Sequence, residues 1–314
     1  MLTPTARGPL SEAVLTAMRT ADTATLADLP EATGPDDVQI TLWSLFALHH
    51  AGFDDVPDDL EWDPQLIAVR RRLEDDFERE LRERAPEFPA PGGDFAEDFF
   101  AFVGAHDGPS IAQHLQRSAT EEHMRQFLQH KSIYSLKESD HTMWTIPRLS
   151  HRVKAAVVEL QYDEYGGGDP HRLHAHLFAR GLEESGLSSE YGAYIDDVPL
   201  EILEQDNAMS MLGLNRRLRA ASLGFLGAFE ATSSAPSRKI ARGLERLGFP
   251  AEITRYYTEH VEADAVHEQL AVRNICGTLL EEHPEQYENI YFGAWVSMHV
   301  DDRYADRMLT EWAA

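Results

Sequence analysis

Two histidines and an aspartate in the segment YTEHVEADAVHE (257–268) could together bind a metal ion. Each residue of an α-helix advances about 100°, so Asp264 lies about 40° from His260, and His267 lies about 20° from it on the other side. A neighbouring acid, Glu259, points elsewhere. Imidazole and carboxylate groups are ligands that iron and manganese favour, whereas thiolates would indicate zinc or an iron–sulfur cluster. The spacing therefore predicts one face of a metal site.

An acid on another apolar segment could complete such a site. Glu230 ends the run SLGFLGAF, and Leu223 and Leu226 lie on its helical face. A buried carboxylate is costly unless it is paired or coordinated. The alternative is that Glu230 lies at a solvated helix end, and the sequence leaves both interpretations open.

Two further acids stand near histidines. Glu164 ends the apolar run KAAVVELQYDEY and is followed by three glycines, with His174 ten residues later. A continuous helix would not bring residues at that spacing together, but a glycine break could. Glu138 in SLKESDH is a weaker candidate, and it also forms the pattern Glu138-x-x-His141.

Four segments together resemble the haem-oxygenase-like dimetal oxidases, also described as iron-containing redox enzymes. They are KESDHTMWTIPRL, LQYDEYGGGDPHRLHAHLF, FLGAFEATSS and YYTEHVEADAVHE, and they cover about residues 130–270. The resemblance implies a ligand set of Glu138, Glu164, His174, Glu230, His260, Asp264 and His267. His141 is not among the positions that it marks, and we expect it beside the ligands.

The resemblance also implies what the site does. It implies two Fe(II) ions, with manganese as an alternative, and dioxygen as co-substrate. The expected reaction is oxidation of a small organic molecule by N-oxygenation, hydroxylation, desaturation or C–C cleavage of an amine, amino acid or fatty acid. Four carboxylates would balance two divalent ions, and without metal they would repel one another. Seven ligands on two ions leave positions open for dioxygen and substrate.

The elements that carry these residues are predicted to be helices. Helical periodicity runs through nearly every segment, and the alternating patterns of strands are missing. The predicted ranges are 40–53, 63–88, 109–139, 147–165, 171–186, 199–234, 237–248, a helix from about 250, 284–300 and 301–313. We therefore predict an all-α, haem-oxygenase-like bundle. Residues 1–108 are expected to form an N-terminal helical extension packed on a core of residues 109–314 that carries the metal site.

The composition restricts the kinds of molecule that the chain is expected to bind. The formal net charge of the 314 residues is −26, which argues against nucleic acid and against anionic membranes, since both need clustered Lys and Arg. Neither a signal peptide nor a run of 18 apolar residues is present, so a cytoplasmic protein is expected. The expected partner is a small-molecule substrate, and the sequence is compatible with a homodimer. The single cysteine, Cys276, is expected to be buried.

Three other functions compete with a di-iron oxidase. A haem oxygenase would need one proximal histidine rather than four convergent acids, and a thiaminase-like enzyme would need a reactive cysteine. A non-catalytic metal-binding protein would bind metal without consuming oxygen. A scaffold with solvated acids would do neither. Lys154 could steer an anionic substrate, although a surface role is expected, and Asp301 and Asp302 are expected at the surface.

Overall fold

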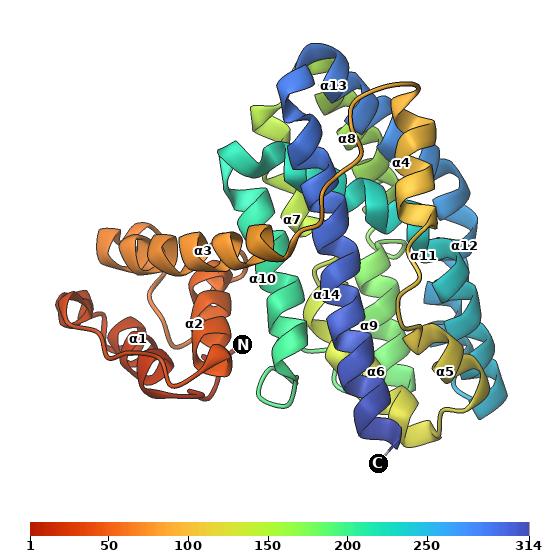
Figure 1. The fold of residues 1–314 in the computed structure, drawn as a ribbon. Helices are drawn as coiled ribbons and strands as arrows, with labels where there is room; N and C mark the ends of the chain where they lie inside the picture. Colours follow the sequence, from red (N-terminus) through yellow and green to blue (C-terminus); the bar gives the residue numbers. More distant parts are fainter. Residues whose placement is uncertain (314) are drawn as a thin grey trace.

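The structure, a computed structural model, describes residues 1–313, with the side chains of residues 262–265 left out. Every regular element in that part of the chain is a helix, which confirms the all-α prediction. The first helices are α1 (Pro9–Thr20), α2 (Pro35–Ala47) and α3 (Pro64–Arg84), with the short helices η1 (Thr23–Ala27) and η2 (Asp58–Trp62) between them. Figure 1 shows α1, α2 and α3 to one side of a helical bundle.

The bundle contains the remaining helices. In chain order they are α4 (Phe95–Gly104), α5 (Ile111–Arg117), α6 (Glu121–Ser135), α7 (Asp140–Met143), η3 (Ile146–Arg148), α8 (His151–Glu164), η4 (Gly166–Gly168), α9 (His174–Glu184), α10 (Leu200–Leu214), η5 (Arg216–Leu218), α11 (Arg219–Leu247), α12 (Ala251–Gln269), the π-helix η6 (Leu270–Gly277), α13 (Thr278–Glu282), η7 (Pro284–Gln286) and α14 (Tyr287–Ala313). Phe99 of α4 is fully buried in an apolar core with residues of α8, α11, η6 and α14. A second core joins α1–α3 to α10 and α6. A division of the chain at residue 108 stays a prediction.

The predicted helix over 109–139 is wrong, because the chain breaks between α5 and α6. The hydroxyl of Thr120 accepts a hydrogen bond from the backbone N–H of His123 at 3.2 Å and thereby starts a new helix. Thr120 followed by two glutamates is an N-terminal signal, which the continuous apolar period hides.

The boundary predicted at residues 234–237 is also wrong. α10 ends at Leu214, before the extended backbone of Asn215, and α11 then runs through Pro236 without interruption. An internal proline removes one backbone hydrogen bond and costs about 3 kcal/mol. α11 packs along both α12 and α14, and burial of its apolar face offsets that cost. The two C-terminal pieces predicted over 284–300 and 301–313 likewise form one helix, α14.

Helices α11 and α14 approach closely because glycines face backbone at their crossing. A Cβ atom at Gly224 would overlap the carbonyl oxygen of Ile290, and one at Gly293 would overlap the carbonyl oxygen of Ala221. Any side chain at these positions therefore has to push the helices apart. Since α11 carries Glu230, this crossing also sets where that carboxylate lies.

We expect Gly293→Ala to lower the free energy of unfolding by about 1–3 kcal/mol, the usual cost of overpacking. Urea unfolding followed by circular dichroism measures it. Gly104→Ala is the matched control, because nothing lies within 4 Å of a Cβ placed there. Equal stability of the two variants would show that the crossing tolerates a methyl group.

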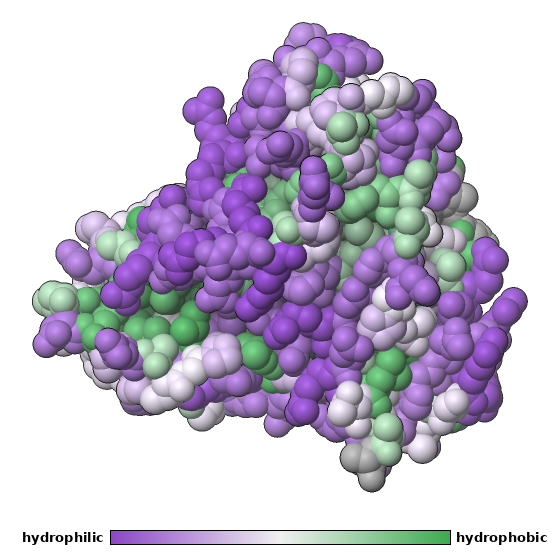
Figure 2. All heavy atoms as spheres, viewed as in Figure 1, coloured by the Kyte–Doolittle hydropathy of each residue, from purple (hydrophilic) through white to green (hydrophobic). Residues whose placement is uncertain are grey.

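The surface is mostly hydrophilic, as the net charge of −26 requires. Figure 2 shows this on one face, where hydrophobic residues are visible mainly around α1 and α2 and between α4 and α14. None of the helices described is both long and apolar enough to cross a membrane.

Candidate metal centre

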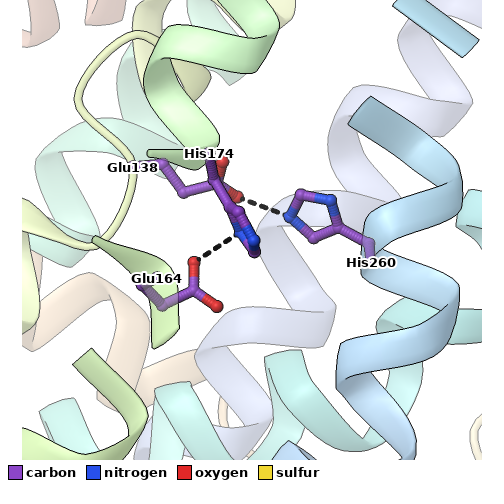
Figure 3. A group of neighbouring side chains, drawn as sticks. All are labelled: Glu138, Glu164, His174 and His260. Carbon is purple, nitrogen blue, oxygen red and sulfur yellow. Dashed lines mark hydrogen bonds and ion pairs between the residues drawn. The ribbon is translucent and has the colours of Figure 1, made fainter. Parts of the chain in front are cut away.

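Four buried side chains from four parts of the chain meet inside the bundle. Glu138 follows α6, Glu164 ends α8, His174 begins α9, and His260 lies on α12. Figure 3 shows all four pointing toward one another. His260 Nε2 lies 3.2 Å from Glu138 Oε1, and His174 Nδ1 lies 2.9 Å from Glu164 Oε2. One ligand atom of each residue lies within 4.8 Å of the others, so one ion could contact all four.

A second group shares a member with the first. Glu164, Glu230 and His267 also place ligand atoms within 4.8 Å of one another, and all three are buried. His267 Nδ1 lies 3.4 Å from Glu164 Oε1 and 3.6 Å from Glu230 Oε2. The two oxygens of Glu164 thus face different groups. Glu230 is only 5% exposed, so the alternative of a solvated helix end is wrong.

The glycine break brings Glu164 to His174, as the sequence predicted. Gly166, Gly167 and Gly168 all have positive φ, between 66° and 86°, a region that side chains other than glycine rarely adopt. A Cβ at Gly166 would also meet the backbone of Arg172. The chain therefore reverses within a few residues, and α9 starts at His174 beside the end of α8.

Comparison with known proteins agrees with this geometry. A sequence model of the iron-containing redox enzymes matches residues 125–302, more than half of the chain. The chain belongs to the iron-containing redox enzyme family. This confirms the family and the haem-oxygenase-like helical fold predicted from the sequence.

The chain is also similar to a nitrosourea synthase from Streptomyces achromogenes subsp. streptozoticus. The two are 31% identical over 121 residues, which make up 38% of this chain and 26% of that protein. The similarity therefore spans about a quarter of the relative's length.

In this member of the iron-containing redox enzymes, the buried histidines lie next to carboxylates, and their pKa values are raised as a result. Burial alone would lower the pKa of His260, but the charge of Glu138, the hydrogen bond to it and the charge of Glu164 together outweigh burial and raise that pKa to about 10. Burial likewise opposes protonation of His267, while contacts with Glu164 and Glu230 raise its pKa to about 11. The pKa of His174 is raised in the same way by Glu164. In the metal-free protein, protons on these histidines thus offset the charge of the acids.

Hydrogen bonds from neighbouring side chains hold the carboxylates in place. The hydroxyl of Tyr256 donates to Glu138 Oε2 at 2.8 Å, and Ser139 donates to Glu164 Oε2 at 3.3 Å. The imidazole of His260 donates from Nδ1 to the Tyr256 carbonyl oxygen at 2.7 Å, so its Nε2 faces Glu138. Sequence reasoning missed Tyr256. Its position four residues before His260, on the same helical face, is the signal that could have found it.

We expect Tyr256→Phe to weaken iron binding by about 10–100-fold, as removing an outer partner of a ligand usually does. The reason is that Glu138 loses the donor that orients it. Anaerobic titration with Fe(II) measures the affinity. Tyr257→Phe is the matched control, because the hydroxyl that donates to Glu138 belongs to Tyr256. Equal affinities of the two variants would contradict an orienting role.

The other predicted residues have different outcomes. Asp264 lies outside the described side chains, so its place in the site stays a prediction. His141 is buried beside the site, and its Nε2 lies 3.2 Å from Asp206 Oδ1, while its ring lies 5.1 Å from that of His50. It belongs to neither ligand group. Cys276 is buried, as predicted.

Proposed function

We propose that the chain is a non-haem di-iron oxidase or oxygenase that uses dioxygen to oxidise a small organic substrate. The observation that carries this proposal is the pair of buried Glu/His groups that share Glu164. The similar nitrosourea synthase is named for a product with a nitrogen–nitrogen bond, which supports N-oxygenation of an amine as the first reaction to test. Hydroxylation, desaturation and C–C cleavage remain within the proposal.

The side chains present fit two iron ions. Their donors are imidazole nitrogens and carboxylate oxygens, which suit iron or manganese. His174 Nδ1 and His267 Nδ1 lie 2.9 and 3.4 Å from oxygens of Glu164, and both nitrogens are buried. Buried nitrogen and oxygen donors that converge in this way could face the same ion. We propose Glu138, Glu164, His174 and His260 for one ion, and Glu164, Glu230 and His267 with Asp264 for the other.

The chain prepares this site by excluding water and by holding its donors. Two ferrous ions, when bound, supply electrons for the reduction of dioxygen. A pocket of about 30 Å³ lies between Glu138, Glu164, Glu230 and His260, which is room for about one water molecule. Burial of the acids strengthens their interaction with any cation that enters. The donors Tyr256 and Ser139 keep the carboxylates fixed while the histidines release their protons.

The decisive experiment is an anaerobic Fe(II) titration of the metal-free protein, followed by exposure to dioxygen. We expect about two irons per chain, then oxygen consumption with a transient visible absorption. His174→Ala should lose iron, and His176→Ala is its matched control, because His176 lies on the same helix, where its ring faces His171. Absence of iron uptake, or equal iron uptake by both variants, would contradict the proposal.

Uptake of iron without oxygen consumption would favour a non-catalytic metal-binding protein instead. A thiaminase-like enzyme is disfavoured by Cys276, since burial raises the pKa of its thiol to about 12 and leaves the thiolate scarce at neutral pH.

A further inference from the structure

A cavity of about 330 Å³ begins at the first ligand group and extends away from it. Glu138 and His260 line one part of the cavity. Its walls come from α6, α10, α11, α12, α14 and the segment leading into α5. Many of the lining side chains are aromatic or apolar, with Tyr134, Phe229 and Tyr257 among them. An apolar chain would fit these walls, because burying it there removes it from water.

Charged side chains gather in another part of the same cavity. Apart from Glu138 and His260, its acidic, basic and histidine lining residues are His106, Lys131, Asp301 and Asp302. Lys131 lies on α6, one turn before that helix ends at Ser135, whereas Glu138 lies in the turn that follows. The side chain of Asp301 is 53% exposed, so these residues lie where the cavity reaches the surface, as the sequence predicted for Asp301.

The charged side chains at this mouth have both signs, and the contacts of Lys131 are long. Lys131 Nζ lies 3.5 Å from Asp301 Oδ1 and 3.5 Å from Gln205 Oε1, at the outer limit of a hydrogen bond. The second carboxylate, Asp302, has His106 Nε2 at 3.0 Å. A ligand with a single negative charge would face two carboxylates here. A ligand with a single positive charge would face the ammonium of Lys131. A head group with both charges can satisfy each of them.

We propose that the cavity binds an amphipathic α-amino acid. Its carboxylate lies against Lys131, its ammonium lies against Asp301 and Asp302, and its apolar side chain points toward Glu138 and His260. This inference rests on the proposed function, since it names the substrate class of the same site. The head group is thereby held at the surface, and the far end of the side chain is the part presented for oxidation.

The test compares three ligands with the same chain: norleucine, hexylamine and hexanoic acid. Binding is measured by calorimetry without dioxygen, in metal-free and in Fe(II)-loaded protein. We expect norleucine to bind at least about tenfold more tightly than either of the others, because it makes charge-assisted hydrogen bonds with both signs. If hexylamine or hexanoic acid binds as tightly as norleucine, the proposal is overturned.

Variants test which residue binds each charged group of the ligand. Lys131→Gln should remove the preference for norleucine over hexylamine, and Asp301→Asn combined with Asp302→Asn should remove the preference over hexanoic acid. A variant that merely misfolds would lose binding of all three ligands, whereas a charge variant should lose only one of the two preferences. Asp306→Asn is the matched control, because Asp306 is an exposed acid on α14 outside the cavity lining. Unchanged preferences in both charge variants would also overturn the proposal.

Failure here is distinguishable from failure of the proposed function. Norleucine preference without oxygen consumption by the iron-loaded protein would leave the binding site standing and remove the oxidase. Oxygen consumption with no preference among the ligands would keep the oxidase and overturn the amino acid site.

Discussion

Glu164→Gln is expected to lower iron affinity by more than about 100-fold at both groups and to abolish oxygen consumption. Removal of an outer partner of a ligand already costs 10–100-fold, and Glu164 is a direct candidate ligand in both groups. The substitution keeps the size of the side chain but removes the charge that His174 and His267 face at 2.9 and 3.4 Å. The number of irons bound per chain, measured after anaerobic loading and desalting, is the readout.

Glu159→Gln is the matched control for this prediction. Glu159 lies one and a half turns earlier on the same helix and is exposed to solvent, so the same change of charge occurs away from the site. Retention of one tightly bound iron by Glu164→Gln would show that the two groups bind metal independently, which would contradict a shared carboxylate.

The metal-free protein is expected to lose stability as the pH rises above about 6.5. The pKa of His260 is raised to about 10 and that of His267 to about 11, from an ordinary value near 6.5. Between those limits the folded chain holds protons that the unfolded chain has released. The free energy of unfolding therefore falls with pH, by on the order of 1 kcal/mol per pH unit for each histidine. The stabilisation is fully present below pH 6.5 and is lost as the pH passes 10–11.

Iron binding should show the opposite dependence, because an imidazole must release its proton to bind a metal. Apparent Fe(II) affinity is expected to rise from pH 6.5 to 8, with about one proton released for each histidine that becomes a ligand. The stability prediction is checked by urea midpoints of the metal-free protein at several pH values. The binding prediction is checked by proton release on iron addition, measured with an indicator dye. Flat profiles in both experiments would mean that the histidines are neutral before metal arrives.

Much of the candidate site could be predicted from the sequence, because its members stand at spacings that helices fix. The spacing of His260 and His267 defines one helical face. The glycines after Glu164 indicate that the chain turns back there, which brings His174 close. The structure brings six of the seven predicted residues together. Their assignment as ligands remains a proposal, and Asp264 lies outside the described side chains.

The remaining features depend on contacts between distant segments, which no spacing encodes. Tyr256 reaches Glu138 across 118 residues of sequence, and Lys131 and Asp301 meet only because α6 and α14 pack together. The continuity of α11 through Pro236 is a similar case, since packing decides it against local propensity. Boundaries were missed where a side chain starts or stops a helix, as Thr120 does.

The π-helix η6 determines how the chain after it is rotated relative to α12, which carries the candidate ligands His260 and His267. A π-turn takes one residue more than an α-turn, so the chain leaves η6 offset by about 100° from the direction of a continuous α-helix. His260 and His267 precede this offset. Cys276 lies near its end, buried with its thiol donating to the Leu223 carbonyl oxygen at 3.3 Å. Within one uninterrupted helical segment, α12 thus directs His260 and His267 toward the site, and η6 directs Cys276 toward α11. We therefore expect the number of residues in η6 to matter for direction: deletion of one residue should redirect the chain from Thr278 onward, which a substitution of similar size would not do.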